Sequence, residues 1–223
     1  MKLVNAELLL DIDIFEDTPA VLVLENPDMM AKVVESLFLL CKSGEGDFVL
    51  SESNKELPIV KAAEMVINPF SIDFNSRQIQ SKLYEELMEC ESLYLREKAE
   101  IQSTIIDYLD KLKQNASYEM ITSNIELDTV KLLKLYEVRI EPQCNTVLER
   151  LIEYTKVLTR LLRKKLLIIT NISSFLNQSD IKELVNMCVY LKMNLLLIES
   201  KELDFHGHIK TYIIDNDNCL IIR

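Results

Sequence analysis

The chain has 223 residues, of which 48% are hydrophobic and 27% charged, proportions ordinary for a globular protein that buries a core. Its net charge of −11 disfavours nonspecific binding of nucleic acid or anionic membranes by the molecule as a whole. Five scattered cysteines without a C-x-x-C pair argue against a disulfide framework and a zinc site. The N-terminus makes a poor signal peptide and no apolar run approaches about 18 residues, so we expect a cytoplasmic protein without a membrane span.

The first 70 residues predict strands and one helix. A turn at Asp17–Pro19 separates two apolar runs, and Asn26 begins a helix that has Pro27 at its first position and reaches about Lys42. We expect four strands in this part of the chain: 3–14, 20–24, 47–50 and 64–67.

The middle of the chain is helical by its pattern. From 75 to 114 there is no proline or glycine and apolar residues keep helical spacing, which predicts one long helix. Further helices are expected at 128–136 and 146–162. Thr146 and Glu149 form the capping-box pattern at the start of the last one.

The segment 163–199 predicts a βαβ unit. Leu166–Thr170 and Leu195–Ile198 are short apolar runs, and between them Asn177 caps a helix whose apolar residues recur at i, i+3, i+4 and i+7. The two strands should be parallel, joined by a right-handed crossover, and covered on both faces of their sheet.

Together these elements predict the α/β class with two domains. Residues 1–72 and 164–223 form an α/β head, which is closed by a pair of terminal strands at 211–214 and 219–222. Residues 73–163 form an α-helical leg inserted between the two halves of the head.

The acidic total conceals a basic segment. Residues 131–165 hold nine basic and four acidic side chains, a net charge of +5, so the rest of the chain carries −16. On the helix at 146–162 leucines gather on one side, and on the other lie four cations: Lys156, Arg160, Arg163 and Lys164. They span about 12 Å, enough to follow several DNA phosphates. The alternative is a solvated face with ion pairs to Glu149 and Glu153.

A polar break between the predicted helices contains Glu119, Glu126 and Asp128. Oxygen-rich loops of this kind bind Ca²⁺, which accepts irregular sets of carboxylates and carbonyls, although the EF-hand spacing is absent. The alternative is a solvated acidic loop.

Nucleotide and hydrolase chemistry are disfavoured. Leu195–Glu199 resembles a Walker B strand that ends in an acid, but no G-x-x-x-x-G-K-[ST] occurs, and the turn at 24–27 places an acid where phosphate needs bare N–H groups. The single histidine pair, His206-Gly207-His208, is interpreted as a surface loop, and no serine stands in a nucleophile-elbow context. We therefore expect no bound nucleotide and no enzyme activity.

Three blocks in order resemble a known family. Glu141–Lys165 has the pattern E-x-Q-x-x-T-x-x-E and runs into KKLLI, a strand and an acidic helix start. Ile72–Ser76 precedes the long helix, and Tyr212–Asp217 lies near the end. The chain resembles the spacer-acquisition accessory proteins of type II-A CRISPR systems, the Csn-type adaptation proteins, over essentially its whole length.

This resemblance implies a head similar to a P-loop ATPase that has lost its nucleotide site, joined to helical legs in a homotetrameric ring. The ring would thread linear double-stranded DNA through a basic channel, with Ca²⁺ stabilising the legs. It would not be a nuclease. It would assist the CRISPR integrase complex and the RNA-guided effector nuclease during spacer capture.

Carried over by position, the resemblance assigns residues to two roles. The channel would be lined by seven cations: Lys131, Lys134, Arg150, Lys156, Arg160, Arg163 and Lys164. Glu126 and Asp128 would lie near the family's calcium-binding acids. Two other readings stay open. An enzyme of nucleotide chemistry would have to bind ATP without glycine-rich loops, and an adaptor would hold protein partners on acidic legs while DNA binding was incidental.

Overall fold

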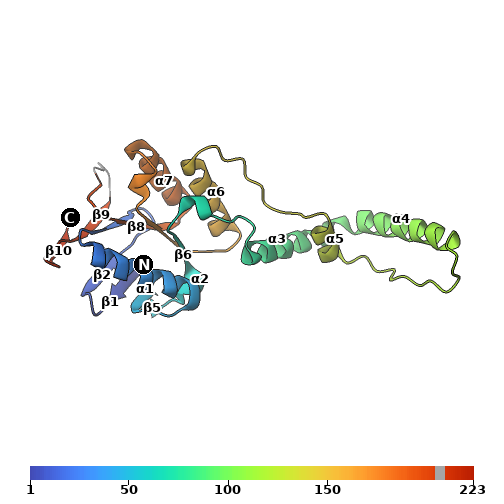
Figure 1. The fold of residues 1–223 in the computed structure, drawn as a ribbon, viewed down its shortest axis with the longest axis horizontal. Coiled ribbons are helices and arrows are strands. Elements are labelled where there is room, and N and C mark those ends of the chain that lie inside the picture. Colours follow the sequence, from blue (N-terminus) through green and yellow to red (C-terminus); the bar gives the residue numbers. More distant parts are fainter. Residues whose placement is uncertain (204–208) are drawn as a thin grey trace. The chain divides into compact units, whose positions relative to one another are not determined.

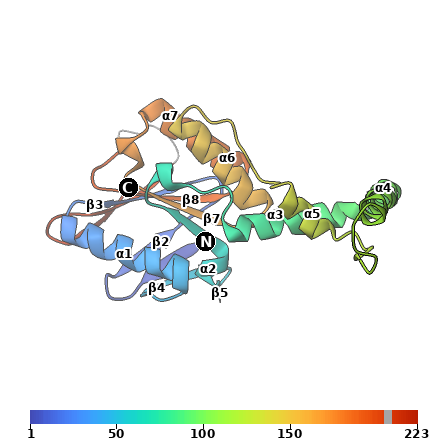
Figure 2. The same ribbon diagram turned by 45° about the vertical axis from the view of Figure 1, so that its right-hand side comes forward.

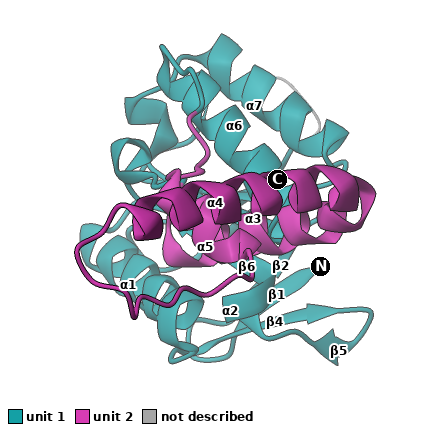
Figure 3. Ribbon diagram, turned by 90° about the vertical axis from the view of Figure 1, so that its right-hand side faces the viewer, with its two compact units in different colours: residues 1–74, 142–223 teal, residues 75–141 magenta. Residues whose placement is uncertain are grey.

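The computed structural model describes residues 1–203 and 209–223, so the histidine pair at 206 and 208 lies outside the described residues. The chain divides into two compact units (Figure 3). The head unit comprises residues 1–74 and 142–223, and the leg unit comprises residues 75–141. Among the described residues, no helix has both the length and the apolar composition needed to cross a membrane.

A six-stranded sheet forms the centre of the head unit (Figure 1). Its order is β10-β9-β3-β8-β7-β6, with β10 antiparallel to β9 and the other neighbours parallel. The strands are β3 (Ala20–Leu24), β6 (Ala63–Val66), β7 (Leu166–Thr170), β8 (Asn194–Glu199), β9 (Lys210–Ile214) and β10 (Leu220–Ile222). Every residue of β3, β7 and β8 is buried, as expected of parallel strands covered on both faces. The predicted βαβ unit is confirmed, since β7 and β8 are parallel neighbours in the sheet and α7 (Gln178–Tyr190) lies between them in the sequence.

A second, antiparallel sheet has the order β2-β1-β4-β5. Its strands are β1 (Lys2–Asn5), β2 (Leu10–Asp13), β4 (Phe48–Glu52) and β5 (Lys55–Glu56). The single strand predicted over 3–14 is wrong, because the chain turns back at residues 6–9. The Asn5 side chain accepts a hydrogen bond from the Leu8 N–H at 2.9 Å, and Leu9 takes a φ of 50°. Leu9 is 82% exposed, so the turn keeps this leucine out of the core although it lies within the predicted strand.

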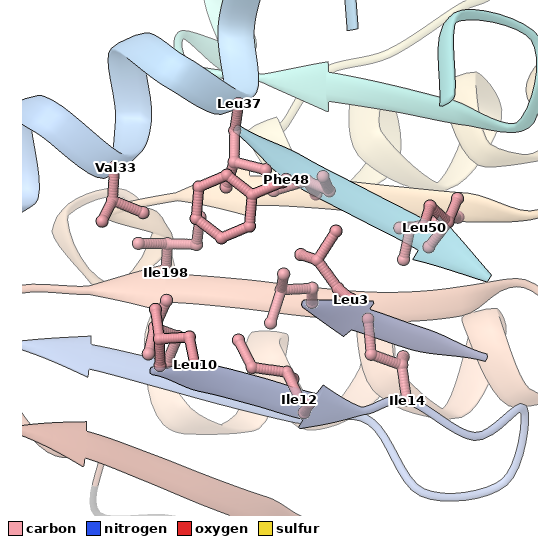
Figure 4. Packing of buried hydrophobic residues seen from close by; sticks show 14 of the residues in the cluster. Leu3, Leu10, Ile12, Ile14, Val33, Leu37, Phe48, Leu50 and Ile198 are labelled. Carbon is pink, nitrogen blue, oxygen red and sulfur yellow. The ribbon is translucent and has the colours of Figure 1, made fainter. Parts of the chain in front are cut away.

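The head core lies between this small sheet, α1 (Pro27–Ser43) and one face of the large sheet. In Figure 4 the side chains of Val33 and Leu37 point from α1 toward those of Leu3, Leu10 and Phe48 on the small sheet. Figures 1 and 2 show α6 (Val147–Arg160) and α7 on the opposite side of the large sheet. The head is therefore a layered α/β structure.

Local sequence sets the ends of α1. The Asn26 side chain accepts hydrogen bonds from the N–H groups of Asp28 and Met29, as an N-cap does. Gly44 ends the helix with a φ of 81°, a left-handed conformation that glycine adopts without strain. The shorter elements of the head are α2 (Ile59–Ala62), η1 (Pro69–Ser71) and η3 (Ile172–Ser174).

The structure places α6 in the head unit, whereas residues 73–163 were predicted to form the leg. The reason is the apolar face of α6. Leu151, Thr155 and Leu158 are fully buried, and the ring of Tyr154 packs edge-on against Phe74 with centroids 5.7 Å apart. This face has the same helical period whichever unit covers it, so the sequence pattern does not identify its partner.

The leg unit contains α3 (Arg77–Glu89), η2 (Cys90–Tyr94), α4 (Leu95–Gln114) and α5 (Thr129–Leu135). The one long helix predicted for 75–114 is interrupted at η2. The amide of Asn75 both donates to the Ile140 carbonyl at 2.8 Å and accepts from the Ile140 N–H at 2.9 Å, which ties the two ends of the unit together.

Candidate nucleic-acid interface

The basic face of α6 lies opposite the helix's buried face. At about 100° per residue, Arg150, Lys156 and Arg160 fall within an arc of about 120°, centred away from Leu151, Thr155 and Leu158. The capping box is confirmed. Glu149 N–H donates to Thr146 Oγ1 at 3.1 Å, while Glu149 Oε2 accepts from the Thr146 N–H at 3.3 Å. A helix fixed at its start and along its apolar side therefore presents these cations on its outer side.

The predicted cations differ in how far they are already engaged. Lys156 Nζ lies 2.6 Å from Glu153 Oε1, and Lys131 Nζ lies 3.5 Å from Asp128 Oδ2. Four of the predicted cations are exposed or half-buried and have no carboxylate within 4.0 Å among residues 1–203 and 209–223: Lys134, Arg150, Arg160 and Arg163. The alternative of a solvated face with ion pairs thus applies to Lys156, which pairs with Glu153. Arg150, Arg160 and Arg163 are available to an external anion.

Lys164 does not belong to this face. Its side chain is only 3% exposed, and Nζ donates to the carbonyls of Val60 and Ala63, each at 2.7 Å. Glu64 Oε2 lies 3.6 Å away. The helix ends before this residue, because α6 stops at Arg160 and Arg163 takes a φ of 55°. The extrapolated helical spacing is therefore wrong for Lys164, which is a core cation and cannot reach a phosphate.

Another cation was missed by the sequence reasoning. Arg77 lies with Lys134 in a groove of about 750 Å³ between α3 and α5, together with Gln80, Ser81 and Tyr84. Glu85 and Glu89 line the same groove, so its charge is mixed. No sequence signal marks Arg77, because it lies outside the basic segment 131–165, whereas the fold places it in the same groove as Lys134.

The three predicted calcium acids are not brought together. Asp128 caps α5, where its Oδ1 accepts from the Lys131 N–H at 3.0 Å, and this hydrogen bond holds the pKa of its carboxyl below the ordinary value. Glu119 and Glu126 are exposed. Over the part of the chain that the structure describes, no three His, Cys, Asp or Glu side chains are grouped to hold one ion. Because Ca²⁺ takes six to eight oxygen ligands, these three side chains do not by themselves form a calcium site in the described residues.

The strand-end acid Glu199 is part of the core. Its Oε2 accepts from Ser173 Oγ at 2.6 Å and its Oε1 from the Ser173 N–H at 3.3 Å. Burial nevertheless raises the pKa of this carboxyl above its ordinary value. At the β3–α1 turn, Asn26 already occupies the N–H groups of Asp28 and Met29. Neither place offers the free donors that a bound phosphate requires.

Comparisons with known proteins agree with the resemblance in the sequence. A model of the family described as CRISPR-associated protein (Cas_Csn2) matches residues 41–218. The chain is 24% identical over 169 residues to a CRISPR-associated protein Csn2 of Streptococcus agalactiae, covering 73% of this chain and 73% of that protein. It is 25% identical over 142 residues to a protein of the same name from Enterococcus faecalis, covering 61% of this chain and 63% of that protein.

A solved structure is also similar. The match to the crystal structure of Stu0660 of Streptococcus thermophilus covers 96% of this chain and 75% of the Stu0660 chain, with a TM-score of 0.60. At 13% sequence identity it is a likeness of fold alone. The family model spans more than half of the sequence. The chain therefore belongs to the Csn2 family of CRISPR-associated proteins.

Proposed function

We propose that this protein binds linear double-stranded DNA, without sequence preference and without catalysis, in the channel of a homotetrameric ring that supports spacer acquisition. The observation that carries the proposal is the outer face of α6, where Arg150, Arg160 and the adjoining Arg163 are free of acidic partners among the described residues. Phosphate contacts of this kind position a protein on DNA and carry no sequence information.

The dimensions of this face suit a duplex. From Arg150 to Arg160 the helix rises about 15 Å, along which duplex DNA presents one phosphate charge per about 1.7 Å of axis. The rest of the chain is strongly acidic, which favours contact at the basic face over contact elsewhere. A ring would place four copies of the face around one duplex while its exterior stayed acidic.

The helix α4 of the leg carries an exposed apolar face that supports assembly. Ile101, Ile105, Tyr108 and Leu112 recur on one side of α4, and each is at least 37% exposed. Contiguous exposed apolar side chains on a helix mark an association surface. We assign this face to a second copy of the chain, because identical apolar stripes are self-complementary in a symmetric assembly.

We also propose that the head is a P-loop-ATPase-like fold without its nucleotide site. Parallel strands with helices on both sides of the sheet support this relation. The engaged donors at the β3–α1 turn and the buried Glu199 support the loss of nucleotide binding. A ring of such heads would act in the cytoplasm with the integrase complex and the RNA-guided effector nuclease.

A matched pair of variants tests the DNA proposal. The triple change Arg150→Gln, Arg160→Gln and Arg163→Gln removes three charges from the proposed interface. The control triple, Lys55→Gln, Lys61→Gln and Lys182→Gln, makes the same charge change at exposed head positions. Binding of linear duplex DNA is measured over a salt series. The slope of log K against log salt is negative, and each lost phosphate contact reduces its magnitude by about 0.9. We therefore expect the magnitude to fall by up to about 2.7 for the first triple and to change little for the control.

Covalently closed circles of the same sequence complete the experiment. Binding of linear DNA alone is expected of a closed ring loaded from ends, and equal binding of circles would refute the ring while leaving the basic face. Equal affinity of the two triples would refute the assignment of the face. If the wild-type protein bound neither form of DNA, the alternative of a protein–protein adaptor would replace this proposal.

A further inference from the structure

The leg unit is held together by little buried apolar surface. Within residues 75–141, all of which the structure describes, Ile79 is the one buried side chain. The elements η2, α4 and α5 contribute none. Since hydrophobic burial normally supplies most of the stability of packed helices, individual polar contacts have more weight in this unit.

One such contact joins three elements of the leg. Glu91 lies in η2, where the helical path from α3 to α4 is interrupted. Its Oε1 accepts a hydrogen bond from Lys98 Nζ at 2.8 Å, on the first turns of α4, and another from Thr129 Oγ1, the first residue of α5. A single carboxylate oxygen thus fixes the interruption and the start of α5 at the same point.

The contact is partly shielded from water. The Lys98 and Glu91 side chains are 29% and 22% exposed, and no other ion pair within the leg has both of its side chains below 30%. They line a pocket of about 300 Å³ whose other walls include Leu87, Ile101 and Leu132. The hydrogen bond from Lys98, followed by that from Thr129, holds the pKa of Glu91 below its ordinary value. The Glu91 carboxylate is therefore ionised at neutral pH.

At Glu91 itself this arrangement leaves no charge for a divalent cation to neutralise, and Glu97 is the other acid that lines the pocket. The carboxylate of Glu91 is matched by the ammonium of Lys98, and a dication at the same oxygen would meet that positive charge directly. The acids expected to hold calcium are dispersed, with Asp128 committed to the α5 cap one residue before Thr129. The cation at this junction is already a side chain of the protein.

We propose that the Lys98 ammonium is the internal cation of the leg, which ties the interruption between α3 and α4 to the start of α5, so that the fold of this leg does not depend on Ca²⁺. The relation between Lys98 and Glu91 depends on the interruption. The two residues are seven apart, and the η2 turn is what sets the distance between their side chains at 2.8 Å. This proposal does not rest on the proposed DNA function.

Hydrogen–deuterium exchange of the full-length protein, read by mass spectrometry, tests the proposal. Peptides covering η2 and the start of α5 are followed in EGTA and in millimolar CaCl₂, without DNA. We expect the same protection in both buffers for the wild-type protein. Lys98→Met should exchange several-fold faster at η2 and α5, Glu91→Gln should do the same, and Lys98→Arg should retain most of the protection. Lys111→Met, an exposed position on the same helix, is the control.

Two results would overturn the proposal. Slower exchange of the wild-type leg in CaCl₂ than in EGTA would show that a bound ion stabilises it. Unchanged exchange in both Lys98→Met and Glu91→Gln would show that the pair holds nothing in place. Complete loss of leg protection in Lys98→Met, with head peptides unaffected and with Lys98→Arg protected, supports it. Because no DNA is present, failure here leaves the DNA proposal standing.

Discussion

Replacement of Lys164 distinguishes a core residue from a DNA contact. Lys164→Met keeps the length of the side chain and removes its charge. The variant loses two charge-assisted hydrogen bonds, to the carbonyls of Val60 and Ala63, and leaves Glu64 without its ammonium partner. Because the side chain is 3% exposed, water cannot replace these contacts.

The size of the effect follows from this burial. Hydrogen bonds to charged groups contribute about 1.5–3 kcal/mol each, and removing one partner of a buried ion pair costs about 3–5 kcal/mol. Relief of the desolvation of the ammonium offsets part of this, so we expect a loss of about 3 kcal/mol. For a chain of this length that corresponds to a fall in Tm of about 6–12 °C.

Urea denaturation followed by circular dichroism measures the loss, with Lys165→Met as the control. Lys165 Nζ lies 2.6 Å from Glu52 Oε2, but these side chains are 51% and 37% exposed. Such surface pairs contribute about 0–1 kcal/mol, so the control should stay near the wild-type midpoint. DNA affinity of folded Lys164→Met should be unchanged. Wild-type stability together with weakened DNA binding would refute the core assignment and restore Lys164 to the interface.

Three further changes test the head. Burial raises the pKa of Glu199 above its ordinary value of 4.5, so its stabilising contribution is present below that pH and lost as pH rises through the folded-state pKa. Glu199→Gln should therefore become more stabilising, relative to wild type, in urea titrations taken from pH 5 to pH 8, and a constant difference would contradict this. Thr146→Ala removes the acceptor of the α6 cap and should lower the unfolding free energy by about 1 kcal/mol, whereas an unchanged urea midpoint would mean that the cap is dispensable. Leu37→Ala empties a fully buried position of the head core and should cost about 2–5 kcal/mol by the same titration, and a loss below 1 kcal/mol would contradict the packing in Figure 4.

The elements that local sequence encodes were predictable. The capping box at Thr146, the N-caps at Asn26 and Asn177, and the left-handed Gly44 each depend on side chains within a few residues of the helix end. The βαβ unit followed from two apolar runs flanking a helical period. Helical spacing also predicted the side of α6 that carries Lys156 and Arg160, whereas Arg163 and Lys164 lie beyond the end of the helix.

What the tertiary structure decided is which surfaces meet. The burial of Lys164 depends on carbonyls about a hundred residues earlier in the chain, and no local pattern carries that information. The same holds for α6, whose apolar face is covered by the head, and for Glu91, whose partners lie seven and 38 residues away. The acids predicted to share one ion lie within ten residues of each other in the sequence, yet the Asp128 side chain caps α5 by accepting from the Lys131 N–H. Sequence by itself determined the helix caps, the buried strands and the apolar faces, but not the turn at residues 6–9 or the interruption at η2. Long-range packing alone determined which charges remain free to bind a partner, because burial and pairing are properties of residues brought together by the fold.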